Sequence, residues 1–365
     1  MASKIVLSGY YGFNNLGDEA VLYSILRTLR TSKPDLKITV LSGDPAQTKK
    51  LYNVEAVNRW KLQEVFKALR QCDLLISGGG SLLQDVTSST SLVYYLGVVW
   101  LAKLLKKKVI YYAQGIGPIT SWVGQKLVPL VSNKVDVITV RDQESKNLLQ
   151  KLEVKIPAIY VKADPVLGLY NREIERKSGQ DLLTRNGIDL ENKPGLIGIS
   201  LREWKDFEGY LKVLARLGDE LTHQGYKILL IPMHFPEDVS VSREVARLME
   251  EEPIIIKEQC TVVEMLGLLG ELDLMVGMRL HALIMATVMG VPSVGISYDP
   301  KVDSFLKLIE QPNAGRVETL DYDTLVGEVF RILGNLQEEQ ETLAERAKEL
   351  RVEARETASL ALNLL

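Results

Sequence analysis

Hydrophobic and polar positions alternate along the chain in two patterns. Short continuous apolar runs, such as 4–10 and 37–43, predict strands that are buried on both faces. Longer segments between such runs, for example 18–30 and 61–70, carry apolar residues at helical spacing. The same alternation starts again near residue 196. Strands that alternate with helices predict parallel sheets covered by helices, so we expect an α/β protein with two doubly wound parallel-sheet domains.

A polar, charge-rich stretch at 171–195 interrupts this alternation and is interpreted as a linker. It separates an N-terminal α/β domain at 1–170 from a C-terminal α/β domain at 196–335. The remaining segment, 336–365, carries a narrow apolar stripe and is predicted to be a long helix. Ligands of such sheets bind at the carboxyl ends of the strands, so we expect the two domains to face a cleft. This plan resembles the GT-B fold, in which the last helix packs back on the first domain.

The chain has 365 residues, with 44 Lys and Arg against 47 Asp and Glu, which gives a formal charge of −3. This near balance argues against a dedicated nucleic-acid-binding protein, which would carry a basic excess. Cys72 and Cys260 are far apart in the sequence and are expected to be reduced thiols in a cytoplasmic protein. Three histidines argue against a His-rich metal site, and no secretory signal peptide is predicted in the first 30 residues.

One mostly apolar segment, 92–105, is followed by three lysines at 106–108. It is too short to span a bilayer, which takes about 20 apolar residues. We favour a helix that is buried between a sheet and its neighbours, with its basic end stabilised by the helix dipole. The alternative is a face that touches anionic lipid at the inner face of the membrane.

The first predicted strand leads into a glycine-rich loop that carries Asn14, Asn15 and Asp18 before a helix begins. These side chains are suited to capping the helix. They are equally suited to hydrogen bonds with sugar hydroxyls, and Asp18 to positioning a hydroxyl nucleophile, so both interpretations stay open. A second glycine loop, with Gly79 and Gly80, follows the fourth strand, where it would let a ligand reach the backbone.

Cationic side chains occur at several other predicted strand ends. Arg279 and His281 stand at the start of a predicted helix, where the helix dipole disfavours positive charge. Lys301 follows the next strand, and Arg202 and Arg141 follow two earlier ones. These five groups are expected to form one cationic pocket for a small, multiply charged anion. A surface ion pair is the alternative for Arg141.

Six motifs occur in order along the chain. They are Gly-Phe-Asn-Asn-Leu-Gly-Asp-Glu-Ala, Ser-Gly-Gly-Gly-Ser-Leu-Leu-Gln-Asp, Ala-Gln-Gly-Ile-Gly-Pro, Arg-Asp, Ala-Asp-Pro and Gly-Met-Arg-Leu-His-Ala. Over about residues 4–310 the chain resembles the polysaccharide pyruvyl transferases. Within that family it resembles the bacterial branch that pyruvylates cell-wall polysaccharide for S-layer anchoring. The Arg-Leu-His motif and the Asn-Asn-Leu-Gly-Asp loop are the specific parts of the resemblance.

This resemblance implies a GT-B-like fold and phosphoenolpyruvate as the donor, with no metal ion or other cofactor. It implies that Arg279 and Leu280 contact the donor. It also implies that His281 is the catalytic candidate, with Lys301 beside it.

The positions at strand ends add further candidates that the resemblance does not assign. Arg141 and Arg202 are expected to bind the donor, and Asp18 is a further catalytic candidate that would orient or deprotonate an acceptor hydroxyl. The first domain is then left to the acceptor. The acceptor-binding candidates are Asn14, Asn15, Gly79 and Gly80.

The predicted reaction moves the enolpyruvyl unit onto two hydroxyls of one sugar in a cell-wall polysaccharide precursor, which forms a pyruvyl ketal and releases phosphate. The saccharide acceptor is expected to be lipid-linked, and no nucleic-acid partner is expected. One alternative is a nucleotide-sugar-dependent GT-B glycosyltransferase or epimerase, which would normally use an acidic residue for the ribose. Another is a non-catalytic sugar-binding scaffold, against which the intact His281 and Lys301 argue.

Overall fold

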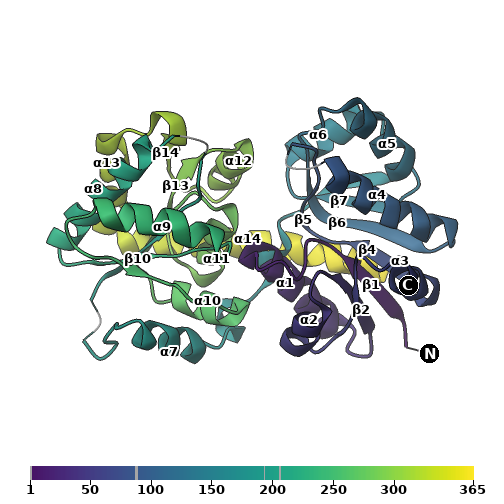
Figure 1. Cartoon of the computed structure of the whole chain (residues 1–365), viewed down its shortest axis with the longest axis horizontal. Coiled ribbons are helices and arrows are strands. Elements are labelled where there is room, and N and C mark those ends of the chain that lie inside the picture. Colours follow the sequence, from purple (N-terminus) through teal and green to yellow (C-terminus); the bar gives the residue numbers. More distant parts are fainter. Residues whose placement is uncertain (1, 87–88, 193, 205–206) are drawn as a thin grey trace. The chain divides into compact units, whose positions relative to one another are not determined.

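The computed structural model describes residues 2–86, 89–192, 194–204 and 207–365 (Figure 1). The chain divides into two compact units. Unit 1 consists of the residues up to Leu169 together with Leu350–Leu365, and unit 2 consists of Tyr170–Glu349. Each unit is built on a parallel sheet that carries helices, which confirms the predicted α/β class.

The sheet of unit 1 has the strand order β3-β2-β1-β4-β6-β7-β8, with β5 paired to β6. Its strands are β1 (Lys4–Ser8), β2 (Lys37–Ser42), β3 (Glu55–Asn58), β4 (Leu74–Ser77), β5 (Gly80–Leu83), β6 (Lys108–Ile116), β7 (Val137–Val140) and β8 (Ala158–Val161). The central strands are almost fully buried, as their continuous apolar runs predict. Strands β2 and β3 are added on one side of β1, whereas β4 and the later strands are added on its other side. Ligands of open α/β sheets bind where the order changes side, so a ligand site is expected at the carboxyl ends of β1 and β4.

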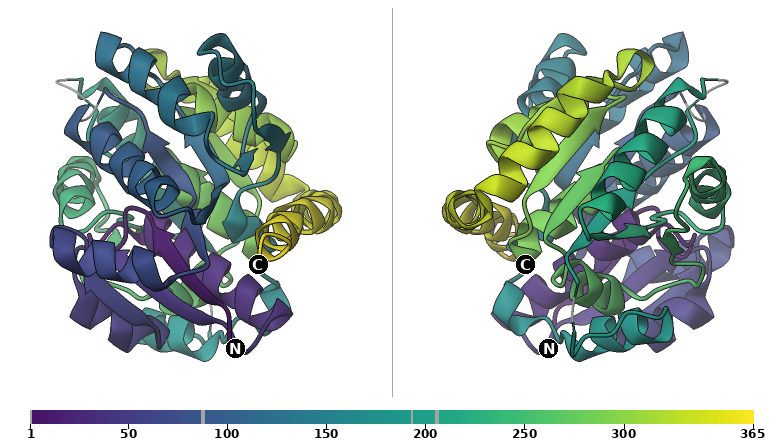
Figure 2. Two further views of the ribbon diagram at one scale, coloured as in Figure 1. Left: turned by 90° about the vertical axis from the view of Figure 1, so that its right-hand side faces the viewer. Right: turned by 90° about the vertical axis from the view of Figure 1, so that its left-hand side faces the viewer.

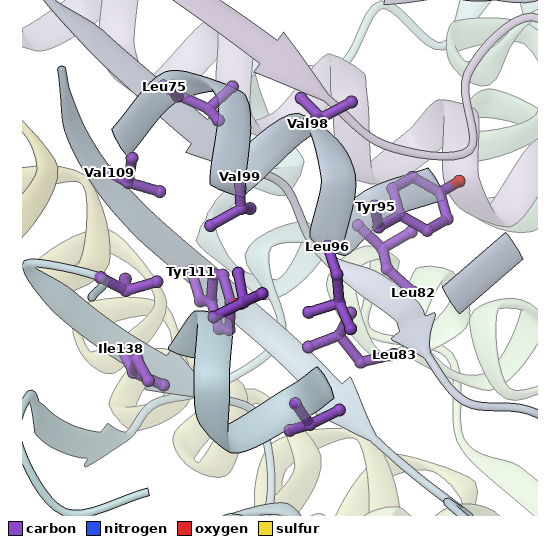
Figure 3. Packing of buried hydrophobic residues seen from close by; sticks show 14 of the residues in the cluster. Leu75, Leu82, Leu83, Tyr95, Leu96, Val98, Val99, Val109, Tyr111 and Ile138 are labelled. Carbon is purple, nitrogen blue, oxygen red and sulfur yellow. The ribbon is translucent and has the colours of Figure 1, made fainter. Parts of the chain in front are cut away.

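Helices pack against one face of this sheet and form a continuous apolar core with it. The helices of unit 1 are α1 (Leu16–Ser32), α2 (Pro45–Tyr52), α3 (Leu62–Gln71), α4 (Ser89–Leu104), α5 (Trp122–Ser132) and α6 (Gln143–Lys151). Residues of α3, α4, α5 and α6 share one core cluster with the sheet. Tyr95, Leu96 and Val99 of α4 lie in it with Val109 and Tyr111 of β6 (Figure 3).

The apolar segment 92–105 lies mainly in α4, which packs between the sheet and its neighbouring helices as the favoured interpretation predicts, except along one exposed side. One face of α4 is buried on the sheet, but Val93 is 46% exposed and Leu104 is 64% exposed. The helix is therefore not covered on all sides. Among the described residues, no helix is both long and apolar enough to cross a membrane.

The sheet of unit 2 has the strand order β11-β10-β9-β12-β13-β14. Its strands are β9 (Leu196–Ser200), β10 (Lys227–Leu230), β11 (Ile254–Ile255), β12 (Leu274–Gly277), β13 (Ser293–Ser297) and β14 (Asn313–Arg316). Its helices are α7 (Lys177–Arg185), α8 (Gly209–His223), α9 (Glu237–Leu248), α10 (Val262–Leu269), α11 (Leu280–Met289), α12 (Pro300–Leu308) and α13 (Tyr322–Gly334). Here the order in which strands are added changes side between β9 and β12, which predicts a ligand site at the carboxyl ends of these two strands.

The long helix α14 (Leu336–Leu362) belongs to both units. Its predicted apolar stripe is buried at Leu343, Ala347, Leu350, Ala354 and Ala358. In unit 1, Arg351 and Arg355 donate hydrogen bonds to the carbonyl oxygens of Leu169 and Gly168, at 2.9 and 3.2 Å. The predicted packing of this helix on the first domain is therefore confirmed.

The segment 171–195, predicted to be a linker, instead contains α7, which packs against α10 in unit 2. Gly179 of α7 lies directly on Gly267 of α10, and Leu182 and Leu183 are buried. The remaining residues of α7 are mostly polar and face solvent. The segment therefore has the composition of a linker, although its few apolar residues are spaced as in a helix.

We expect Gly179→Ala to destabilise unit 2. A Cβ at residue 179 would lie 2.1 Å from the carbonyl carbon of Gly267 and 2.1 Å from the backbone nitrogen of Leu268. Helix α7 would have to move away from α10, which should lower the free energy of unfolding by about 1–3 kcal/mol. Denaturant unfolding measures this change.

Gly327→Ala in α13 is the matched control, because nothing lies within 4 Å of the added Cβ. Replacing a helical glycine at an open position should raise stability by about 0.5–1 kcal/mol. Equal stability of the two variants would contradict the packing of α7 on α10.

Candidate functional site

Four of the predicted side chains follow neighbouring strands in unit 2. Arg202 follows β9, Arg279 and His281 follow β12, and Lys301 follows β13. These three strands are consecutive in the sheet and pair in parallel. Because the carboxyl ends of parallel strands meet at one edge, the fold brings these four residues to the same edge of the sheet.

Arg279 is held by a buried carboxylate that the sequence pattern did not reveal. It is the N-cap residue of α11, where the helix dipole disfavours a cation. Its Nε donates to Oδ2 of Asp238 at 2.9 Å, and its Nη2 donates to Oδ1 of the same carboxylate. The Asp238 side chain is 2% exposed. The carboxylate therefore offsets the charge of the guanidinium and fixes its plane.

Asp238 also joins two loops at this edge. Its Oδ2 accepts hydrogen bonds from the backbone N–H groups of Met233 and His234, at 3.1 and 2.9 Å, in the loop that follows β10. Because β10 is next to β9 in the sheet, His234 becomes a further member of the site. Its Nε2 lies 3.6 Å from the carboxylate of Glu237. His234 follows an apolar strand, as His281 does, and that position could have identified it.

Arg202 lies against two aromatic rings. Its guanidinium carbon is 4.6 Å from the ring centre of Tyr298 and 5.7 Å from that of Trp204. The two rings are 5.2 Å apart and connect the loop after β9 with the loop after β13. In the part of the chain that the structure describes, the buried Nε of Arg202 has no hydrogen-bond partner. A buried N–H group without a partner is costly, so this position favours an anionic ligand.

His281 and Lys301 each occupy the second position of a helix. His281 is half-buried in the first turn of α11. Asp299 caps α12 by accepting a hydrogen bond from the backbone N–H of Lys301 at 2.9 Å. Two helix amino ends thus lie at this edge of the sheet, and their backbone N–H groups suit an anion. Within the described ranges, no group of three or more His, Cys, Asp or Glu side chains is placed to hold a metal ion.

In unit 1, the glycines after β1 and β4 enclose the side chain of Tyr11. An added Cβ would lie 2.3 Å from the ring at Gly9 and 2.1 Å from the hydroxyl oxygen at Gly78. Burial, with a further contribution from the negative charge of Asp18, raises the pKa of Tyr11 well above its usual value. Its hydroxyl has no hydrogen-bond partner among the described residues. Tyr11 is therefore a buried polar group at the switch point that the sequence pattern did not reveal.

Gly79 and Gly80 were predicted to offer their backbone to an acceptor, but both are buried. A Cβ at Gly79 would lie 2.8 Å from Cγ1 of Val21. Gly80 has a φ of +87°, and a Cβ there would lie 2.8 Å from Oδ1 of Asp18. Packing of neighbouring side chains thus accounts for both glycines, and Gly80 lets the Asp18 carboxylate approach the loop.

The loop after β1 is fixed by its own side chains. Asn15 caps α1, because its Oδ1 accepts hydrogen bonds from the backbone N–H groups of Gly17 and Asp18, at 3.1 and 3.4 Å. Glu19 accepts a hydrogen bond from the backbone N–H of Gly12 at 2.7 Å, and burial raises the pKa of this carboxyl. Asn14 is exposed and has a φ of +57°. The capping interpretation therefore holds for Asn15, whereas Asn14 presents its amide at the surface.

An aromatic cluster around Arg59 adjoins this loop and was not predicted. Arg59 is 3% exposed and donates a hydrogen bond to the carbonyl oxygen of Gly9 at 2.9 Å. The ring centres of Tyr94, Tyr95, Trp60 and Phe13 lie 4.2, 5.0, 5.0 and 5.2 Å from its guanidinium carbon. Phe13 also stacks on Tyr10, with 4.3 Å between the ring centres. The cluster connects the loop after β1 with α4.

Arg141 lies in unit 1, where it forms a buried ion pair. Its Nη1 is 3.1 Å from Oδ2 of Asp164, and the two side chains are 7% and 4% exposed. Its Nη2 donates to Oγ of Ser81 at 3.1 Å. The Arg-Asp and Ala-Asp-Pro motifs therefore bind each other, and the charge of Arg141 is already compensated. Its contacts give no support to the prediction that it shares a pocket with the cations of unit 2.

We expect Asp238→Asn to destabilise the protein strongly. The change leaves the guanidinium of Arg279 without its charged partner at a helix amino end. Removing one member of a buried pair should lower the free energy of unfolding by about 3 kcal/mol, measured by denaturant unfolding. Asp321→Asn is the matched control, because Asp321 is an exposed N-cap and Asn caps helices equally well. A similar small change in both variants would contradict the positioning role of Asp238.

Two solved structures that contain a bound UDP-sugar have the same fold. Anabaena Alr3699/HepE in complex with UDP-glucose aligns with a TM-score of 0.67, at 12% identity, over 99% of this chain and 100% of that one. The UDP-GlcNAc 2-epimerase from Neisseria meningitidis, bound to UDP-GlcNAc, aligns with a TM-score of 0.65, at 12% identity, over 99% of both chains. At this identity the likeness shows the fold alone, and it confirms the GT-B-like class.

Comparison of sequences identifies the family. The amylovoran biosynthesis protein AmsJ of Erwinia amylovora is 21% identical over an alignment 407 positions long, gaps included, which covers 96% of this chain and 96% of that protein. The family model described as polysaccharide pyruvyl transferase matches residues 15–300. The matched range begins at Asn15, the last residue of the loop after β1, and includes the Arg141–Asp164 pair, Arg202, Arg279 and His281. The chain therefore belongs to the polysaccharide pyruvyl transferase family.

Proposed function

We propose that this pyruvyl transferase uses phosphoenolpyruvate as its donor and binds it at the edge of the unit 2 sheet. The observation that carries the proposal is the orientation of Arg279 by buried Asp238 at the amino end of α11. Arg202 follows the neighbouring strand. Phosphoenolpyruvate has a carboxylate and a phosphate, and a guanidinium group binds either one through two hydrogen bonds. The backbone of Leu280, at the start of α11, belongs to the same proposed site.

In the proposed reaction, the methylene carbon of the donor takes a proton and the central carbon becomes electrophilic. A sugar hydroxyl attacks that carbon and loses its proton, and the bond between this carbon and the phosphate oxygen then breaks. Phosphate leaves with the bonding electrons, and a second hydroxyl of the same sugar closes the ketal and loses its proton. We assign delivery of the methylene proton to His281, and neutralisation of the leaving phosphate to Lys301. We leave Arg141 outside the donor site, because it lies in unit 1 and its side chain is only 7% exposed, whereas that of Arg279 is 19% exposed.

We infer that the saccharide acceptor binds to unit 1, next to the loop after β1. Asn14 is exposed there, and an amide both donates and accepts hydrogen bonds, as sugar hydroxyls do. The stacked rings of Tyr10 and Phe13 and the 63% exposed ring of Trp60 offer apolar faces on which a sugar can lie. Asp18, at the start of α1, is the candidate for taking a proton from an acceptor hydroxyl.

The acceptor that we propose is a lipid-linked precursor of cell-wall polysaccharide, as in the branch that pyruvylates such polymers for S-layer anchoring. Membership of the family supports a role in polysaccharide synthesis, and the name of AmsJ places that relative in the biosynthesis of amylovoran. A cytoplasmic location, where phosphoenolpyruvate is available, is part of the same proposal.

We expect His281→Ala to lower the rate of phosphate release from phosphoenolpyruvate about a hundredfold or more, as for loss of a general acid. The assay uses a panel of free and lipid-linked saccharides as acceptors. The variant should still be stabilised thermally by phosphoenolpyruvate, because the two guanidinium groups that are proposed to bind it are unchanged.

His223→Ala is the matched control, because His223 is exposed in the last turn of α8 and should not affect turnover. A fully active His281→Ala variant would remove His281 from the chemistry. Thermal stabilisation of the native protein by UDP-sugars, with none by phosphoenolpyruvate, would overturn the proposed donor.

We expect Asn14→Gly to raise the Michaelis constant for the saccharide about tenfold, the effect of one or two lost hydrogen bonds. Glycine accepts the positive φ of this position, so the loop should keep its shape. Asn15→Ser keeps a capping side chain on α1 and separates the cap from ligand binding. The Michaelis constant for phosphoenolpyruvate should stay unchanged in both variants. A defect confined to the donor would mean that donor and acceptor are assigned to the wrong units.

A further inference from the structure

Helix α4 presents an apolar face to solvent. Val93 is 46% exposed and Leu104 is 64% exposed, with exposed Gly97 and half-buried Trp100 between them at helical spacing. The opposite face, which includes Tyr95 and Val98, packs into the core of unit 1 (Figure 3). A helix that is apolar all round is normally covered on all sides. The outward face of α4 is therefore as apolar as a protein surface that is covered by another molecule.

Helix α5 extends this apolar surface. A Cβ at Gly124, near the start of α5, would lie 2.9 Å from Cδ2 of Leu92, near the start of α4. After the end of α5, Nζ of Lys134 lies 5.3 Å from the ring centre of Trp100. These contacts show that the two helices run in the same direction, and they lie side by side (Figures 1 and 2).

The exposed side chains of these two helices make one surface, which we call the α4–α5 face. On α5, Trp122 is 73% exposed, Val123 47% and Leu130 54%. The α4–α5 face consists of Val93, Trp100, Leu104, Trp122, Val123 and Leu130. It contains two of the four tryptophans of the chain, and tryptophan is the side chain most typical of the boundary between water and lipid.

The sequence segment that carries the α4–α5 face has charged residues of one sign only. Residues 86–135 contain six lysines and no Asp, Glu or Arg. Because the whole chain carries −3, the rest of it carries −9. Two acidic residues border this segment, and both are hydrogen-bonded or paired with residues inside it. Asp85 accepts hydrogen bonds from Thr120 and Ser121, and Asp136 pairs with Lys103 and Lys108 at 2.7 and 3.2 Å.

We propose that the α4–α5 face docks on the surface of an anionic lipid bilayer. The apolar side chains would enter the boundary between headgroups and acyl chains, while Lys106, Lys126 and Lys134 reach the lipid phosphates. A second copy of this chain fits the face less well. A symmetric contact would bring the same lysines of both copies together, and like charges repel.

Helix α4 is also connected, through Arg59, to the loop next to which the acceptor is proposed to bind. Tyr94 and Tyr95 of α4 lie against Arg59, which also bonds to the loop after β1. Docking of α4 would therefore hold that loop close to the lipid surface, where a lipid-linked saccharide is presented. This last step rests on the proposed function, whereas the docking itself does not.

The test measures sedimentation of the full chain with vesicles, in the absence of donor and acceptor. Vesicles of phosphatidylcholine with phosphatidylglycerol should bind the protein, and added salt should weaken this binding. Vesicles of phosphatidylcholine alone should bind it more weakly. Trp122→Ser with Leu130→Gln should reduce binding about tenfold or more, and Lys106→Asn with Lys126→Gln should reduce both the binding and its salt dependence.

Two substitutions elsewhere in unit 1 are the matched controls. Val352→Ser removes a 60% exposed apolar side chain from α14, and Lys50→Gln removes an exposed lysine from α2. Both should leave vesicle binding unchanged. Quenching of the tryptophan fluorescence by brominated lipid gives a second measurement on the native sequence, which does not depend on the folding of any variant.

Three results would overturn the proposal. The first is no binding to anionic vesicles at low salt, and the second is binding that the α4–α5 variants do not reduce. The third is an oligomer that Trp122→Ser with Leu130→Gln converts to monomers in light scattering, because a second copy would then cover the face. Because none of these measurements involves turnover, a failure of the proposed pyruvyl transfer would leave them unaffected.

Discussion

In both sheets every strand runs in the same direction, so the chain must return through a helix before each new strand begins, except at β5, which continues the direction of β4. This constraint sends every loop that leaves a strand to one edge of its sheet. Arg202, Arg279 and Lys301, far apart in the sequence, are neighbours in unit 2 for that reason. It also directs the amino ends of α11 and α12 to the same edge, so backbone N–H groups and cationic side chains converge without any sequence motif that contains them all.

The sequence could identify a residue in an electrostatically unfavourable place, but not the partner that compensates for it. Arg279 was noticed because a cation at a helix amino end is disfavoured. Asp238 was not, because an acid in the first turn of α9 is favourable and so looks ordinary. Its partner is 41 residues away and becomes visible only in the folded chain. For the same reason, Arg141 was expected to bind a ligand until the fold placed Asp164 beside it.

Strands β5 (Gly-Ser-Leu-Leu) and β14 (Asn-Ala-Gly-Arg) were not predicted, because neither is a continuous apolar run. The other strands could be predicted from their apolar runs, which have few alternative explanations in an α/β chain. Helix α7 could not, because its buried side rests on one glycine contact and two leucines, and the rest is polar. Glycines were ambiguous in a similar way. A sequence does not distinguish a glycine that admits a ligand from one that admits a protein side chain. At Gly78 and Gly79 the neighbours are the Tyr11 ring and Val21, and only the structure reveals them.

The path of α14 has a consequence for the order in which the protein folds during synthesis. Unit 1 includes residues 350–362 of this helix, whose buried side chains and arginines close over Gly168 and Leu169. Those residues leave the ribosome after all of unit 2 has been made. Although the sheet of unit 1 is synthesised first, unit 2 is the first to have its whole sequence available. The nascent sheet of unit 1 must therefore wait, incompletely covered, until the second half of α14 emerges.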